Sequence, residues 1–138
     1  MKIAICFFGI LGGIEGKNGK GASKPIIEIS KKYYNQNIFT EDTDVFMHTW
    51  SKDYKTEILN AFSPKSYIIE KQKKFKIPNY VFGIRTQSRK QQKIRKQNHY
   101  SRWYSTMKAM DVVREYELKN NIKYDLVLMT RFDIAWEE

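Results

Sequence analysis

The chain has 138 residues, which is the length of one small domain. Hydrophobic residues make up 41% of the sequence and aromatic residues 14%, so the chain can bury a core and is not a disordered protein. Cys6 is the single cysteine. It excludes a framework of internal disulfides and a zinc site built from several cysteines, and it favours a reducing, cytoplasmic compartment.

The formal net charge of +10 comes from one segment. Residues 71–108 hold 12 Lys and Arg and no acidic residue, which leaves 13 basic and 15 acidic residues in the rest of the chain. A local positive field of this kind attracts nucleic acid, anionic lipid headgroups or a substrate diphosphate. The alternative is that the segment is an ordinary solvated surface.

An apolar run, Lys2–Phe8, predicts a buried strand of a parallel sheet, since it is short, rich in aliphatic and aromatic residues and followed by a glycine. A secretory signal sequence is the alternative, and the glycines just after the run disfavour it. The loop Gly9–Gly21 contains six glycines. Their spacing matches neither a P-loop nor a dinucleotide-binding fingerprint.

A helix is predicted next, capped at Ser23 or Lys24, with Pro25 in its first turn and its end near residues 35–37. Its expected apolar stripe consists of three residues at helical spacing, with Ile27 and Tyr34 beside them. The three stripe residues are Ile26, Ile29 and Tyr33.

Two further strands and a helix follow in the middle of the chain. Asp44–Trp50 and Ser66–Glu70 are predicted as strands, and Lys55–Phe62 as a short helix that ends before Pro64. Residues 42–44 spell a DxD sequence, but they precede their strand and therefore lie at the edge of the sheet away from any ligand. We interpret them as a turn.

The last third of the chain begins with a predicted irregular, basic loop at 71–98. A long helix over Asn98–Asn120 and a buried strand over Tyr124–Thr130 follow. The helix is recognised by apolar residues three and four positions apart, which would pack in the core, although Trp103 and Tyr104 could instead stack on a base. The row comprises Tyr100, Trp103, Tyr104, Met107, Met110 and Val113.

Strands that alternate with helices predict one α/β domain over residues 1–138, a three-layer sandwich with a mostly parallel sheet and a Rossmann-like layout. In such sheets ligands bind beyond the carboxyl ends of the strands. Four chain segments lie at these ends and are therefore expected to supply a functional site. They are 8–9, 48–51, 70–71 and 131–133.

Arg131 and Asp133 follow the last strand, on the same side of it, with Phe132 opposite. A carboxylate at this edge can hold a divalent cation that bridges phosphates, and a guanidinium group can clamp a phosphate with two donors. A structural ion pair between the two side chains is the alternative.

The long helix also carries a polar row of Ser101, Arg102, Ser105 and Lys108, and its N-terminal end would favour an anion. His48 is expected to pack or to hydrogen-bond at the end of its strand rather than to act as a ligand or base.

Three blocks resemble the N-terminal, donor-binding half of GT-A-like glycosyltransferases of bacteria and viruses, which make capsule or lipopolysaccharide. The blocks are KIAICFFG at 2–9, DVFMHTWS at 44–51 and the helix-strand segment 101–133 that ends in TRFD. They cover about two thirds of the chain, and their order and spacing carry the likeness.

The resemblance implies a nucleotide-sugar donor and a glycan or lipid-linked acceptor. It implies that Asp133 binds Mn²⁺ or Mg²⁺, that Arg131 contacts the phosphates and that Gly9 lies against the nucleotide. Ser101, Tyr104 and Lys108 would line the donor site from the preceding helix.

The sequence also departs from the family pattern. Gly12 stands where an arginine is common, and Arg131 replaces the first carboxylate of the DxD motif, so basic residues could neutralise the diphosphate without a metal. The chain stops five residues after Asp133, whereas a complete domain would need further strands. The resemblance therefore predicts a donor-binding half, active only with more chain, or an inactive remnant that associates with a transferase or with itself.

Two other partners are predicted from the basic segment. It could dock on an anionic membrane surface, which would make the protein peripheral on the inner face of the membrane. The rival to an enzyme is a nucleic-acid-binding module that uses the 71–108 segment with Tyr100 and Trp103.

Overall fold

The computed structural model describes residues 1–11, 23–78 and 88–134. Four strands form one parallel sheet in the order β3-β2-β1-β4. Their bounds are Ile3–Gly9 for β1, Thr43–Thr49 for β2, Ser66–Ile69 for β3 and Leu126–Arg131 for β4. The predicted α/β class with a parallel sheet is therefore confirmed, and so is the interpretation of the N-terminal run as a buried strand.

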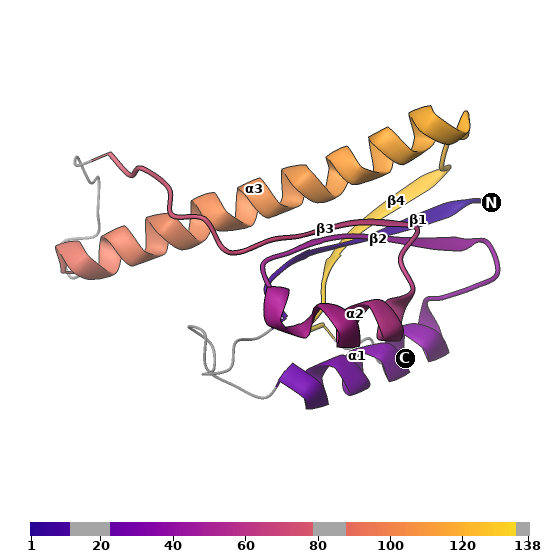
Figure 1. Ribbon diagram of the computed structural model, residues 1–138, viewed down its shortest axis with the longest axis horizontal. Helices are drawn as coiled ribbons and strands as arrows, with labels where there is room; N and C mark the ends of the chain where they lie inside the picture. Colours follow the sequence, from indigo (N-terminus) through magenta and orange to yellow (C-terminus); the bar gives the residue numbers. More distant parts are fainter. Residues whose placement is uncertain (12–22, 79–87, 135–138) are drawn as a thin grey trace.

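The helices cover both faces of the sheet (Figure 1). Helices α1 (Ser23–Asn37) and α2 (Lys55–Phe62) lie together on one face, with a single 3-10 turn at Lys52–Tyr54 before α2, and α3 (Arg89–Asn120) crosses the other face. This arrangement confirms the predicted three layers.

Strand β1 lies at the centre, and its alternating side chains build both halves of the core. Ile5 and Phe7 pack toward α1 and α2, whereas Cys6 and Phe8 pack toward α3. The Phe7 ring lies 4.8 Å from the ring of Phe132, which follows β4. Phe132 is fully buried, on the side of the sheet opposite to Arg131, as alternation along the strand requires.

The predicted apolar stripe of α1 is wrong by one position. Among residues 26–37 of this helix, Ile27, Ser30 and Tyr34 are buried, and Ile29 is 51% exposed. The reason is the Tyr34 side chain, whose hydroxyl hydrogen-bonds Thr130 Oγ1 at 2.6 Å inside the core. That long-range contact fixes the rotation of α1 about its axis, and the local pattern of isoleucines does not.

The predicted loop at 71–98 is also wrong in its last part, because α3 begins at Arg89. A capping box starts the helix: Ser88 Oγ accepts from the Gln91 N–H at 3.3 Å, and Gln91 Oε1 accepts from the Ser88 N–H at 3.1 Å. The Ser-x-x-Gln spacing is the sequence signal for this start. The predicted helix end at Asn120 is confirmed.

The buried face of α3 differs from the predicted one as well. Ser101, Ser105, Ala109, Val112 and Val113 are its buried residues. Small side chains let the helix approach the end of β1 closely, and the Gly9 N–H donates to Ser105 Oγ at 2.7 Å. The bulky residues of the predicted stripe cannot occupy this narrow space, and most of them point outward: Trp103 is 70% exposed.

The N-terminal half of α3 extends past the edge of the sheet, beside the segment 71–78 (Figure 1). Gln97 joins the two: its Nε2 donates to Lys73 O at 2.8 Å, and its Oε1 accepts from the Phe75 N–H at 3.0 Å. The Phe75 ring also stacks on Tyr100 with centroids 6.0 Å apart. We call residues 71–78 the strap.

The strand register aligns the carboxyl ends. Gly9 pairs with Thr49, Thr49 pairs with Ile69, and Phe8 pairs with Arg131. The backbone at Gly9 has a φ of +100°, a conformation that favours glycine. The Gly9 carbonyl then accepts from the Trp50 N–H at 3.2 Å, so the loops after β1 and β2 are held to each other at this edge.

Candidate functional site

A cavity of about 520 Å³ lies at the carboxyl edge of the sheet, on the α3 face. Residues from β1, β4, α3, the strap and the end of β2 enclose it, so segments far apart in the sequence meet there. The described lining consists of Phe8, Gly9, Ile10, Trp50, Gln72, Ile94, Asn98, Ser101, Arg102 and Arg131.

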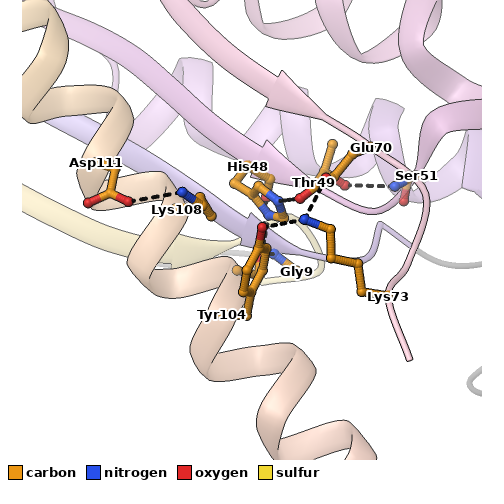
Figure 2. Close-up of polar contacts among 10 residues, drawn as sticks. Gly9, His48, Thr49, Ser51, Glu70, Lys73, Tyr104, Lys108 and Asp111 are labelled. Carbon is orange, nitrogen blue, oxygen red and sulfur yellow. Dashed lines mark hydrogen bonds and ion pairs between the residues drawn. The ribbon is translucent and has the colours of Figure 1, made fainter. Parts of the chain in front are cut away.

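A chain of hydrogen bonds passes beside this cavity and joins three strand ends to α3. Buried His48 contacts Ser105 Oγ through Nδ1 at 2.7 Å and Glu70 Oε1 through Nε2 at 3.1 Å. Glu70 also forms an ion pair with Lys73 at 3.1 Å. Figure 2 shows His48, Glu70, Lys73 and Tyr104 turned toward one another.

Burial lowers the pKa of His48 below its usual range, and the neighbouring Lys73 and Lys108 charges add to this effect while Glu70 opposes it. The ring is therefore neutral at neutral pH. A proton on Nε2 satisfies Glu70 as acceptor, and Nδ1 then accepts from the Ser105 hydroxyl. This arrangement agrees with the prediction that His48 hydrogen-bonds at its strand end.

Glu70 and Lys73 hold opposite charges at the mouth of this network. Partial burial raises the pKa of Glu70, but the hydrogen bonds from His48 and Lys73 outweigh burial, and the net shift is downward. The Lys73 ammonium group also contacts the Tyr104 hydroxyl and lies 4.5 Å from the centre of that ring. Glu70 is thus the counter-ion that fixes the strap to the sheet.

Ser105, His48 and Glu70 together have the composition of a hydrolase triad, which the spacing along the sequence did not indicate. The geometry argues against a nucleophile, because Ser105 is fully buried and its oxygen already accepts from the Gly9 N–H. A hydroxyl that no substrate can reach does not attack one. We therefore infer that the three residues stabilise the carboxyl edge of the sheet.

Trp50 is the aromatic residue that links the network to the cavity. Its indole stacks on Tyr104 with centroids 5.4 Å apart, and the His48 ring meets it edge-on at 4.7 Å. Only 6% of the side chain is exposed, and its Nε1–H has no hydrogen-bond partner in the structure described. A buried donor without an acceptor lowers the stability of this edge.

Three of the predicted site residues do line the cavity, namely Gly9, Ser101 and Arg131, and so does Arg102 from the predicted polar row. Ser101 is buried and accepts from Gln72 Nε2 at 3.0 Å. Arg131 is about half exposed, on the same face of the sheet as Phe8. The position of the strand ends predicts that Gly9 and Arg131 meet at one edge, and α3 adds Ser101 and Arg102 from its polar row.

Tyr104 and Lys108 are placed differently. Tyr104 lies behind Trp50 and supports it, outside the described lining of the cavity. Lys108 is one turn farther along α3, where its ammonium group pairs with Asp111 at 3.4 Å (Figure 2). The DxD at 42–44 is at the opposite edge, where Asp44 accepts from the Tyr124 hydroxyl at 2.6 Å.

Asp133 is engaged by Arg131. The Arg131 Nε donates to Asp133 Oδ1 at 2.8 Å, and an Nη atom of the same guanidinium group contacts Oδ2. Within residues 1–11, 23–78 and 88–134, no three His, Cys, Asp or Glu side chains gather where they could hold a metal ion. A cation that bridges a phosphate needs only one or two protein carboxylates, and a cation at Asp133 stays a prediction.

Sequence reasoning missed the walls of the cavity, which come from Gln72, Ile94 and Asn98. Gln72 and Ile94 lie within the predicted irregular segment, and the capping box at Ser88 is the signal that places Ile94 on a helix. Asn98 is the first residue of the predicted long helix. Trp50 lies within 48–51, one of the strand ends expected to supply a functional site, and it does line the cavity.

Searches against protein-family models, curated proteins and solved structures found no match to this chain. Its function must therefore be argued from the residues of the cavity.

Proposed function

We propose that the cavity binds the nucleoside diphosphate part of a sugar donor, and that the chain is the donor-binding part of a cytoplasmic glycosyltransferase of surface polysaccharide synthesis. The observation that carries the proposal is the composition of the cavity wall. At the carboxyl edge of a parallel sheet it combines two guanidinium groups with polar side chains and apolar surfaces.

The volume of about 520 Å³ suits a ligand of this size. Phe8, Trp50 and Ile94 offer apolar surface to a base or to the face of a sugar. The polar side chains of Asn98 and Ser101 can bond hydroxyl groups of the ligand.

Arg102 and Arg131 would bind the diphosphate. Two N–H groups of Arg131 are directed to Asp133, which leaves three of its five donors for a phosphate. In the transfer step an acceptor hydroxyl oxygen bonds to the anomeric carbon, and its proton passes to the departing diphosphate or to water. The nucleoside diphosphate departs with the electrons of the broken C–O bond. Positive groups that stabilise this departing charge lower the barrier.

The test is a binding titration of the chain with UDP, GDP, CDP and CMP, each with and without Mn²⁺. We expect one nucleoside diphosphate to bind, with at least tenfold weaker binding by Arg102→Gln, which keeps a polar side chain but lacks the charge. Arg114→Gln is the matched control, because Arg114 is an exposed arginine on the same helix, outside the cavity lining.

Binding that needs Mn²⁺ and is lost in Asp133→Asn would restore the metal prediction. Absence of binding by every nucleotide, in a chain that melts cooperatively, would overturn the proposed function and favour an inactive remnant.

A further inference from the structure

The outward face of α3 carries basic and large apolar side chains in one row. Its members recur at three- and four-residue spacing on the side of the helix opposite to the buried serines and valines. We call this row the outer face. It consists of Lys93, Lys96, Tyr100, Trp103, Met107, Met110 and Arg114.

The centre of the outer face is apolar. Trp103 is 70% exposed, Met107 49% and Met110 39%, and each lies one helical turn from the next. Contiguous exposed apolar side chains of this size on one helix mark an interaction surface rather than chance exposure.

Basic residues flank this apolar centre on both sides. Lys93 and Lys96 precede it and Arg114 follows it, and no acidic residue occurs between Glu70 and Asp111. The Asp111 carboxylate lies at the rim and is already paired with Lys108. The outer face is therefore a basic amphipathic surface about 30 Å long, by the rise per residue of an α-helix.

We propose that the outer face binds the surface of an anionic lipid bilayer. Trp103, Met107 and Met110 would enter the boundary between headgroups and acyl chains, and the lysines and arginine would contact anionic headgroups. In the part of the chain that the structure describes, no helix is both long and apolar enough to cross a membrane. The proposed contact is one in the plane of the membrane.

Two other occupants fit the outer face less well. A second copy of the chain would bring the same basic groups face to face, and the repulsion opposes self-association. A nucleic acid would satisfy the charges and could stack on Trp103, but Tyr100 already stacks on Phe75 and the two methionines offer no flat ring to a base. A lipid surface would contact both the charged and the aliphatic side chains of the outer face. Its binding would not involve the cavity.

The test is sedimentation of the chain with phosphatidylcholine vesicles that contain or lack phosphatidylserine, at low and at high salt. We expect retention by the anionic vesicles only, weakening as salt rises. We also expect the tryptophan fluorescence to shift to shorter wavelength on binding. Because Trp103 is the tryptophan that enters the lipid, this shift should be absent in Trp103→Phe.

Matched variants separate the outer face from the total charge. The double variant Lys93→Glu, Arg114→Glu should bind the anionic vesicles more weakly, by at least about fivefold for each basic residue lost. Lys119→Glu with Lys123→Glu changes the net charge equally, at exposed positions away from the row, and should weaken binding much less. Trp103→Ala should weaken binding, whereas Leu118→Ala, at a residue 83% exposed, should not.

All of these positions are exposed or at the rim, and an unchanged thermal melt will confirm that each variant folds. Equal loss in both charge variants, or equal retention by vesicles without phosphatidylserine, would overturn the proposal. So would retention by single-stranded RNA in place of vesicles, or a dimer that Trp103→Ala dissociates, and these results would assign the outer face to nucleic acid or to a second copy.

Discussion

Trp50 and Tyr104 stack with their ring centroids 5.4 Å apart and their planes inclined by 23°. The stack joins the residue after β2 to the middle of α3. Because Trp50 lines the cavity and Tyr104 does not, Tyr104 sets the position of a side chain in the cavity wall without itself belonging to that wall. The loop after β2 is held by an aromatic contact in addition to its backbone hydrogen bond to Gly9.

Tyr104→Ala should therefore destabilise the fold by about 2 kcal/mol, through the lost ring contact and the space left behind. Tyr104→Phe keeps the stack and loses only the contact of the hydroxyl with Lys73, so its effect on unfolding in urea should be small. An equal loss in both variants would show that the hydroxyl, and not the ring, holds Trp50 in place.

Ser105→Ala removes the partner of two buried groups, His48 Nδ1 and the Gly9 N–H. We expect a loss of roughly 2–4 kcal/mol in the free energy of unfolding, since unpaired buried polar groups are costly. Ser30→Ala is the control: Ser30 is just as buried, but its hydroxyl has no partner among the described residues. That variant should be neutral or slightly stabilising, and a comparable loss there would refute this account.

Stability should fall as the pH drops below the ordinary His value of 6.5. Burial keeps the pKa of His48 lower in the folded protein, so the unfolded chain takes up a proton first and is favoured. The pKa of Glu70 is also lowered in the folded protein, so the free energy of unfolding should fall further as the pH drops below the ordinary Glu value of 4.5. Urea unfolding at a series of pH values measures this dependence.

His48→Gln should flatten the pH dependence just below 6.5. The control His99→Gln, at an exposed position on α3, should retain it. A flat profile in the unmodified chain would show that His48 is protonated equally in both states.

Cys6 should not react with a thiol reagent in the folded protein. The side chain is fully buried in β1, and burial raises the pKa of its thiol to about 12, so almost no thiolate is present at neutral pH. Labelling with Ellman's reagent should proceed only as fast as the chain opens, and fully in denaturant. Fast labelling under native conditions would mean that β1 is accessible.

Most of the sheet could be predicted from the sequence, because its strands are short, nearly continuous apolar runs between turn signals. Helix α2 has the predicted bounds for a similar reason: Ser63, in the left-handed conformation with φ 42°, and Pro64 end it locally. The positions of Gly9 and Arg131 at one edge followed from the parallel topology alone.

The rotations of α1 and α3 could not be predicted, since contacts distant in sequence decide them. On α3 two serines and an alanine face the sheet, while tryptophan and methionine face outward, the reverse of a simple apolar pattern. The contact between Ser105 and the Gly9 amide accounts for this. The His48–Glu70 pair was missed for the same reason: the residues are 22 positions apart and meet only once β2 and β3 pair.

The two sides of the cavity differ in how tightly their residues are packed. Phe8 and Trp50 belong to the packed edge of the sheet, whereas Ile94 and Asn98 belong to the part of α3 that extends beyond it, where the buried residues of that helix have not yet begun. Local opening of a helix costs least where it buries least. If a ligand contacted both sides, the cost of ordering the start of α3 would offset part of its binding free energy. On binding of such a ligand, amide exchange should slow more at the start of α3 than at its end. The affinity would then depend on a segment that contributes little to the stability of the core.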